Sequence, residues 1–308
     1  MTNTTPTTPP LYIETPTYTD PEFNRERGAE VYFKMESFQP TRSFKIRGMD
    51  RICRYHWERG KRKFIASSGG NAGYSLAYAV IRLGGRVKVV VPESTAAFMR
   101  NKIAALGAEV EVHGEAWDEA HAYTERLARE TGAVYVPPFD DPLLWEGHAT
   151  IMAECARQIA EPDAVVVSVG GGGLLCGVLQ GMEAVGWKRA RVVTAETEGA
   201  ASYAASLAAG RLVTLDRITT IAKTLGAKTV AAEALRWAER RDIRSAVVTD
   251  ARSLAAGRRF ADAMGVLVEP ACGAALAAVY DGTAALQGAG RILAIACGGA
   301  GIRRADLV

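Results

Sequence analysis

The feature that most constrains the fold is an alternation of short β-branched runs with longer segments of helical periodicity. The short runs lie at 63–67, 86–92, 109–114, 134–138, 164–170, 191–196, 245–250 and 291–299. Strands separated by helices in this way are typical of parallel sheets. We therefore expect an α/β fold.

Glycine is concentrated directly after three of these strands, in the segments 67–73, 169–174 and 297–301. In open α/β sheets, ligands bind outside the carboxyl ends of the strands, so three such loops on one sheet edge are suited to surround one ligand. Each loop taken alone is equally well explained as a tight strand-to-helix turn. The three together favour a single binding site.

Four consecutive glycines, Gly170–Gly173, precede an apolar helix that is expected to begin at Leu174. Such a segment directs backbone N–H groups and a helix N-terminus at an anion, which predicts a phosphate site. Leu175 and Cys176 replace the third glycine of a dinucleotide fingerprint, and no Walker lysine follows. A nucleotide-binding dehydrogenase stays an alternative, because Glu196 ends the next strand about 20 residues on, where a ribose-binding acid belongs.

Lys45 is the first candidate for a reactive side chain. The hydroxyls of Thr41 and Ser43 are placed to cap a helix that starts beside it, so Lys45 should face a positive helix dipole together with Arg42 and Arg47. Cationic surroundings lower the pKa of an amine. A partly neutral lysine is a nucleophile toward carbonyl groups, as Schiff-base lysines are.

The segment from Ser68 to Asn71 places small residues, a hydroxyl and a side-chain amide before a helix. This arrangement suits a substrate carboxylate held by backbone N–H groups, although an ordinary capped turn has the same composition. A phosphate site, a carboxylate site and a Schiff-base lysine together indicate amino-acid chemistry on pyridoxal phosphate.

Composition narrows the class of partner. The 308 residues carry a formal net charge of only +3, with basic residues scattered along the chain, so nucleic acid binding is not indicated. No apolar run reaches the roughly 18 residues of a membrane span, and the N-terminus lacks a signal pattern. Residues 1–10 have the composition of a disordered leader. We expect a cytoplasmic protein of two domains with a small-molecule partner.

Cysteines and histidines indicate neither disulfides nor zinc. The five cysteines, an odd number without CxxC spacing in apolar surroundings, are Cys53, Cys155, Cys176, Cys272 and Cys297. The four histidines, which lack metal-ligand spacing, are His56, His113, His121 and His148. We expect reduced thiols and structural histidines.

Six segments carry a family resemblance: SFKIRG, SSGGNAG, PPFDDPLLWEGHA, SVGGGGLLCGV, EPACGAALAAVY and the terminal CGG. In this order they resemble the serine/threonine dehydratases of the fold type II, tryptophan synthase β-like, pyridoxal-phosphate family, and in particular the animal-type serine dehydratases. The resemblance runs from about residue 11 to residue 299. It implies two open, twisted parallel-sheet lobes with the cofactor between them. The large domain would comprise 1–39 and 142–308, and the small domain 40–141.

The resemblance also implies roles toward the cofactor. Lys45 would carry pyridoxal phosphate as a Schiff base and Phe44 would stack on its ring. Asn71 would hydrogen-bond the ring's 3′-oxygen. Gly170–Gly173 with Leu174 would hold the phosphate.

Toward the substrate, Ser68, Gly69 and Asn71 would meet the carboxylate, and Cys297 would face the pyridine nitrogen. A thiol is a poor counter-charge for a pyridinium, so the ring should be a weak electron sink that favours prompt loss of a β-hydroxyl. The implied reaction is β-elimination from L-serine or L-threonine, giving ammonia and pyruvate or 2-oxobutanoate. The alternative within this family is β-replacement, as in cysteine synthases. We expect a homodimer.

A monovalent cation such as K+ is implied as well. The matching positions are the acid Glu196 and the main-chain carbonyls of Gly170, Ala200, Leu225 and Ala227. A salt bridge at a strand end is the alternative for Glu196.

Two positions depart from the family pattern. Gly69 stands where close dehydratases carry alanine and related racemases serine, so we expect weak racemisation and added space beside the substrate's β-carbon. Thr224 stands where close relatives carry a smaller apolar residue, and the sequence predicts no role for it.

Overall fold

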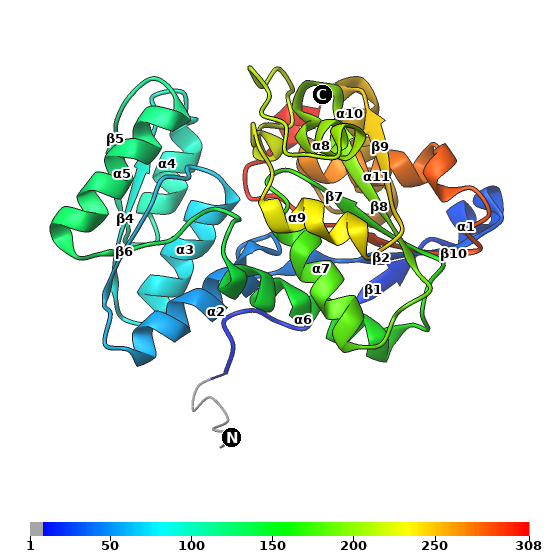
Figure 1. Ribbon diagram of the computed structural model, residues 1–308, viewed down its shortest axis with the longest axis horizontal. Helices are drawn as coiled ribbons and strands as arrows, with labels where there is room; N and C mark the ends of the chain where they lie inside the picture. The colour runs from blue at the N-terminus through cyan, green and yellow to red at the C-terminus, as the bar shows by residue number, and fades with distance from the viewer. Residues whose placement is uncertain (1–8, 308) are drawn as a thin grey trace.

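The computed structural model describes residues 9–307 and places them in two lobes, each with its own sheet (Figure 1). Of the leader expected at 1–10, residues 1–8 lie outside the described residues. The chain forms the first strands of the large lobe, crosses to the small lobe, and then returns to complete the large one.

The large sheet has parallel neighbours except at one edge, where the first two strands are antiparallel. Its strands are, in spatial order, β1 (Thr17–Thr19), β2 (Glu30–Lys34), β10 (Arg291–Ile295), β7 (Ala164–Ser168), β8 (Arg191–Thr197) and β9 (Ile243–Val248). Every residue of β7 is buried, because a central parallel strand is covered on both faces and reads as a continuous apolar run. The parallel sheet was predicted, whereas the antiparallel edge strand was not.

Helices cover the large sheet and follow the loops at the ends of its strands. They are α1 (Pro21–Arg27), α6 (Pro142–Gln158), α7 (Gly173–Ala184), α8 (Ser202–Ala209), α9 (Ala232–Arg236), α10 (Asp250–Met264) and α11 (Pro270–Tyr280). Helix α6 packs along α7, and α10 along α11, which lies on β7 and β8. The periodicity of the sequence predicts a helix from 273 to about 286, and the structure differs at both ends. Pro270 starts α11, and Gly282, with a φ of 64°, turns the chain before a separate 3-10 turn at Ala284–Leu286.

The small sheet is parallel throughout. Its strands are, in spatial order, β5 (Glu109–Val112), β4 (Arg86–Val91), β3 (Lys63–Ala66) and β6 (Val134–Tyr135). Its helices are α2 (Lys45–Glu58), α3 (Asn71–Arg82), α4 (Ala97–Ala104) and α5 (Trp117–Thr131). Helix α2 packs against both α3 and α6 and so connects the lobes (Figure 1). All four strands fall within the predicted small domain, 40–141, while the domain boundaries themselves stay a prediction.

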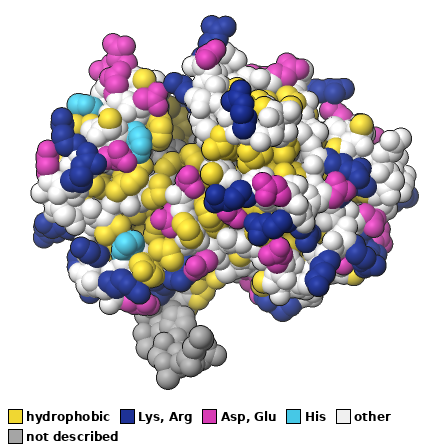
Figure 2. All heavy atoms as spheres, viewed as in Figure 1, with side chains coloured by type: hydrophobic (Ala, Val, Ile, Leu, Met, Phe, Trp, Pro, Cys, Tyr) yellow, Lys and Arg dark blue, Asp and Glu magenta, His cyan; other side chains and the backbone are white. Residues whose placement is uncertain are grey.

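The distribution of charged side chains on the surface agrees with the scattering of basic residues along the sequence (Figure 2). On the face shown in Figure 2, basic and acidic side chains are interspersed, and hydrophobic side chains gather between the two lobes. None of the helices in the described residues combines the length and the apolar character needed to cross a membrane.

Candidate active site

Lys45 is the first residue of α2 and lies where the two lobes meet. Its Nζ donates a 2.5 Å hydrogen bond to the carbonyl oxygen of Pro138, in the segment before α6, and lies 5.1 Å from the centroid of the Phe44 ring. The residue remains partly accessible, but protein surrounds the amine, and this burial lowers the pKa of Lys45 to about 8. An appreciable fraction of the amine is therefore neutral at mildly alkaline pH.

The predicted cause of this shift is wrong, although its direction is right. Arg47 points away from Lys45 into the large lobe, where its Nε donates to Glu36 at 2.7 Å and its Nη1 to Glu154 at 2.6 Å. The guanidinium and Glu36 are fully buried, and Lys34 completes the group by pairing with Glu154 at 2.6 Å. Loss of hydration, rather than neighbouring cations, lowers the pKa of Lys45.

The predicted hydroxyl cap is also wrong. Phe44 occupies the N-cap position of α2 without a side-chain cap, and Thr41 Oγ1 lies 2.9 Å from Ser75 Oγ instead. The Ser43 hydroxyl has no partner among the described residues. The turn is held by the chain after β10: Phe44 N donates to the carbonyl oxygen of Cys297 at 3.2 Å. This contact brings the third glycine segment to Lys45.

Glycine is required in that segment because two stretches of backbone approach closely. A Cβ on Gly298 would lie 2.2 Å from the carbonyl oxygen of Arg42, which also accepts a 2.8 Å hydrogen bond from Gly299 N. Gly298 has a φ of 94°, and Arg42 itself has a φ of 59°, which is unusual for a residue with a side chain. The turn before Lys45 and the turn after β10 therefore fix each other.

Gly170–Gly173 form a cradle from which side chains are excluded. A Cβ on Gly171 would lie 2.2 Å from the ring of Phe139, and one on Gly173 would lie 2.5 Å from the Phe139 carbonyl oxygen. The N–H groups of Gly171, Gly172 and Gly173 donate to no other group in the described chain, and α7 begins at Gly173, one residue before the predicted start. Free N–H groups at a helix N-terminus suit a phosphate.

Asn71 is the first residue of α3, and its buried side-chain amide is engaged at both ends. Its Nδ2 donates to Glu269 Oε2 at 2.9 Å, and its Oδ1 accepts from Ala300 N at 2.7 Å. One Nδ2 hydrogen remains for a further acceptor. The predicted bond to the cofactor's 3′-oxygen is compatible with this orientation and stays a prediction.

Ser68 and Gly69 lie in the turn between β3 and α3. Ser68 Oγ accepts a 3.4 Å hydrogen bond from Gly70 N, so the hydroxyl contributes to the turn itself. The expectation of space beside the substrate at Gly69 is wrong, because a Cβ there would lie 2.5 Å from Thr95 Cγ2 and 3.1 Å from Val91 Cγ1. The missing methyl group leaves room for small-lobe side chains.

Cys297 is buried beside Cys272. A side-chain hydrogen bond with Cys272, together with burial, holds the pKa of Cys297 well above its usual value, so the thiol stays neutral. All five cysteines are buried and unpaired, which agrees with the prediction of reduced thiols. The role of Cys297 toward a pyridine nitrogen stays a prediction.

Glu196 is fully buried at the end of β8. Its Oε1 accepts from Tyr203 N at 2.8 Å and its Oε2 from Ala204 N at 2.7 Å, so the carboxylate is not open to a ribose. This geometry argues against the dinucleotide alternative. Nor does Glu196 form the salt bridge considered for it, because the described residues give it no cationic partner, and burial raises its pKa to about 7.

The cation site implied around this carboxylate stays a prediction, and the following contacts connect some of its positions. β7 pairs with β8 so that Val169 N donates to the carbonyl oxygen of Ala195, which places Gly170 beside Glu196. A Cβ on Gly170 would lie 3.0 Å from Leu225 Cα. The carbonyl oxygen of Leu225 accepts from Ala227 N at 2.7 Å, and Ala200 ends the 3-10 turn that follows β8. The described residues contain no group of three or more His, Cys, Asp or Glu side chains placed to hold a metal ion.

Sequence reasoning missed several residues that border the site. Glu269 precedes α11 and accepts hydrogen bonds from Asn71 and Thr224, although its segment was used only for the family resemblance. Phe139 fills the space over the glycine cradle. His148 is buried with its ring 4.8 Å from that of Phe44, as a structural histidine would be. Their positions depend on contacts between distant segments, which no local pattern reveals.

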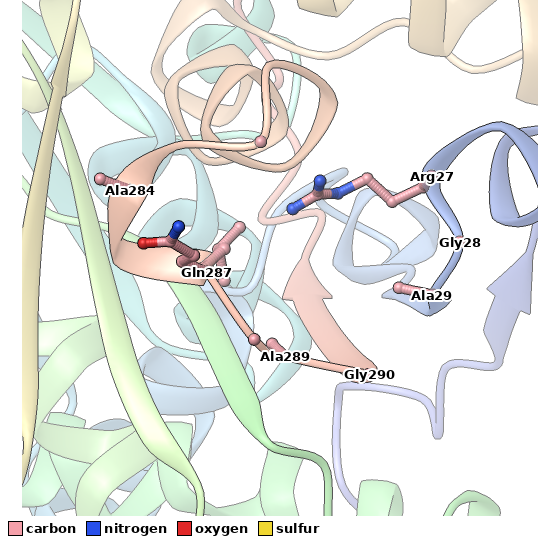
Figure 3. A pocket seen from close by; sticks show the side chains of 10 residues that line it. Arg27, Gly28, Ala29, Ala284, Gln287, Ala289 and Gly290 are labelled. Carbon is pink, nitrogen blue, oxygen red and sulfur yellow. The ribbon is translucent and has the colours of Figure 1, made fainter.

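A separate surface hollow, seen from close by in Figure 3, has a volume of about 540 Å³. It is lined by the turn at Arg27–Ala29 and by the segment from Ala284 to Gly290, with the Arg27 side chain pointing into it. These residues precede β2 and β10, so the hollow lies at the amino ends of strands whose carboxyl ends face Lys45. It belongs to a different edge of the sheet.

Comparison with known proteins finds relatives over almost the whole chain. Residues 9–298 match the family model of pyridoxal-phosphate dependent enzymes. The L-serine dehydratase/L-threonine deaminase of Bos taurus is 47% identical, over 97% of this chain and 94% of that protein. The human protein of the same name is 46% identical over the same shares.

Solved structures agree with these relatives. A fungal L-serine ammonia-lyase from Rhizomucor miehei superposes with a TM-score of 0.91 at 33% identity, covering 96% of this chain and 97% of that one. The processed threonine deaminase isoform 2 of Solanum lycopersicum gives 0.89 at 29% identity, covering 96% and 82%. The fold is therefore that of the fold type II enzymes, and the chain belongs to the family of pyridoxal-phosphate dependent enzymes.

Proposed function

We propose that this chain is a pyridoxal-phosphate-dependent ammonia-lyase that eliminates water from L-serine and L-threonine, giving ammonia and pyruvate or 2-oxobutanoate. The observation that carries the proposal is the meeting of Lys45, the free N–H groups of Gly171–Gly173 and the neutral thiol of Cys297 at one place. Relatives named for this activity match almost the whole chain.

The residues present fit the cofactor. The cradle at Gly170–Gly173 offers N–H groups and excludes side chains, which suits a phosphate, and Leu174 continues it into α7. Phe44 offers a ring beside Lys45. When bound, pyridoxal phosphate supplies an electron sink for the electron pair released at the substrate's α-carbon.

Lys45 is suited to move the α-proton. Its amine has a pKa of about 8, near the range in which a group both accepts and returns a proton efficiently, and the Pro138 carbonyl orients Nζ. Ser68, Gly69 and Asn71, at the start of α3, are proposed to meet the substrate carboxylate. Backbone N–H groups at this helix N-terminus favour an anion.

Cys297 favours elimination. A neutral thiol provides no counter-charge for a protonated ring nitrogen, so we expect the electron sink to be weak. Under a weak sink, prompt departure of the β-hydroxyl is favoured over return of the proton to the α-carbon.

A monovalent cation, K+, is proposed to neutralise Glu196. The carboxyl is buried without a cationic side chain among the described residues, and this isolation raises its pKa to about 7. The carbonyls of Gly170, Ala200, Leu225 and Ala227 would complete the oxygen shell, and oxygen ligands suit a hard cation. A homodimeric state and a cytoplasmic location complete the proposal.

The proposal is tested with purified protein in two steps. We expect a visible absorbance band that borohydride removes, followed by keto-acid formation from L-serine and L-threonine without added sulfur nucleophile. Absence of the band contradicts the cofactor assignment. A product that forms only with sulfide, and contains it, supports β-replacement instead.

A further inference from the structure

Glu269 is a buried carboxyl group that joins three separate parts of the chain. It precedes α11, and only 7% of the residue is exposed. Its Oε2 accepts from Asn71 Nδ2 at 2.9 Å and from Thr224 Oγ1 at 2.8 Å, while its Oε1 accepts from Gly301 N at 2.7 Å. Asn71 comes from the small lobe, and Thr224 and Gly301 come from two segments of the large lobe.

These hydrogen bonds favour the ionised form of Glu269. The Asn71 amide nitrogen and the Gly301 N–H are obligatory donors, and the Thr224 hydroxyl donates as well. A protonated carboxyl turns one oxygen into a donor, so at least one of the three bonds would lose its acceptor or weaken. Protonation of Glu269 therefore loosens the connection between the lobes.

Lys102, on α4, is a cation that acts on Glu269, and its Nζ donates to the carbonyl oxygen of Ala300 at 2.9 Å. Arg42 acts on Lys102, and Glu269 in turn helps to raise the pKa of the Cys297 thiol. Burial raises the pKa of Glu269, and the donors Gly301, Thr224 and Asn71, followed by Lys102, oppose this rise.

The connection matters because it fixes the Asn71 amide. Ala300 N holds Oδ1 at 2.7 Å and Glu269 holds one Nδ2 hydrogen, so the second Nδ2 hydrogen has a single direction. Without the acceptor on Glu269, only the hydrogen bond from Ala300 N still fixes the amide, and Nδ2 loses its partner. A cofactor or substrate oxygen that uses this hydrogen would then lose a fixed donor.

We propose that Glu269 is a positioning residue that orients Asn71, and that the Thr224 hydroxyl keeps Glu269 in the ionised form that does so. This inference rests on the proposed elimination. It assigns a role to a position for which the sequence alone predicts none. Thr224 is also within packing distance of the small lobe, since its Cγ2 would lie 3.6 Å from a Cβ on Gly70.

The test compares Thr224→Val, which keeps the shape and removes the donor, with Thr224→Ser, which keeps the donor. Thr131→Val, at an exposed position that ends α5, is the matched control. The holoenzyme is labelled with 13C at the glutamate carboxyl carbons, and the Glu269 signal is assigned with Glu269→Gln. Its pH titration is recorded beside the pH profile of kcat/KM for L-serine.

We expect Thr224→Val to move the Glu269 titration toward higher pH by roughly 1–2 units, the loss of one hydrogen bond to a charged group. The acidic limb of the pH profile of kcat/KM should move by the same amount. The titration and the pH profile of Thr224→Ser and Thr131→Val should resemble those of the wild type. Thr224→Ala, which also lacks the donor, replaces the valine variant if that variant does not fold.

Three outcomes test three separate claims. An unchanged Glu269 titration in Thr224→Val overturns the role of the hydroxyl. A shifted titration with an unchanged acidic limb overturns the positioning role of Glu269. A wild-type holoenzyme that forms no keto acid contradicts the proposed function instead, and the carboxyl titration still measures the Thr224–Glu269 bond.

Discussion

Replacing Gly69 with alanine separates two accounts of the turn before α3. From the sequence, the absence of a methyl group at residue 69 is expected to widen the substrate site. In the structure, a methyl group at this position would point into the small lobe. The new Cβ would lie 2.5 Å from Thr95 Cγ2, 2.8 Å from Thr95 Oγ1 and 3.1 Å from Val91 Cγ1. Because both branches of Thr95 are too close, no rotation about its first side-chain bond removes every contact.

Overpacking of this kind costs about 1–3 kcal/mol, so Gly69→Ala should unfold at a lower urea concentration. Adding Thr95→Ala removes the two nearest atoms and should recover at least about 1 kcal/mol in a double-mutant cycle. The kcat/KM ratio for serine over threonine should stay unchanged. Equal stability of Gly69→Ala and wild type, together with a shift toward serine, would refute this reasoning and restore the space argument.

Three further predictions concern other parts of the molecule. Arg47→Met leaves Glu36 buried without its cation and should lower the free energy of unfolding by about 3–5 kcal/mol in urea titrations; a change below 1 kcal/mol, on the order of a surface pair, contradicts the importance of this network. Cys297→Asp should slow keto-acid formation and produce some racemised or transaminated product, and a wild-type rate without side products contradicts the weak-sink argument. Because burial raises the pKa of Glu196 to about 7, the folded protein loses stability as pH rises from the unfolded value through 7, so K+ should raise Tm more at alkaline than at acidic pH. Glu196→Gln should abolish that difference, and a large organic cation in place of K+ should give none.

The alternation of strands and helices was sufficient to predict the α/β class, the parallel sheets and the meeting of three glycine segments. These features depend on local periodicity and on the rule that ligands bind at the carboxyl ends of parallel strands. Lys45, the glycine cradle and Asn71 were found because each lies at a helix start directly after a recognisable turn.

The features that the sequence could not predict depend on where side chains point and on contacts between residues that are far apart in the chain. Arg47 and Lys45 are two residues apart, yet only Lys45 faces the site, because Arg47 reaches Glu36 and Glu154 in the large lobe. Glu269 is 198 residues from its partner Asn71, so no local pattern joins them. The environment at Gly69 likewise depends on a turn contributed by another strand.

The most direct test of the account is to locate the cofactor covalently. The purified protein is reduced with borohydride and digested, and the peptide that carries a pyridoxyl group is identified by mass spectrometry. We predict the modification on Lys45, with neither modification nor keto-acid formation in Lys45→Ala. A pyridoxyl group on another lysine, or a Lys45→Ala variant that turns over L-serine within tenfold of the wild-type rate, would contradict the central claim.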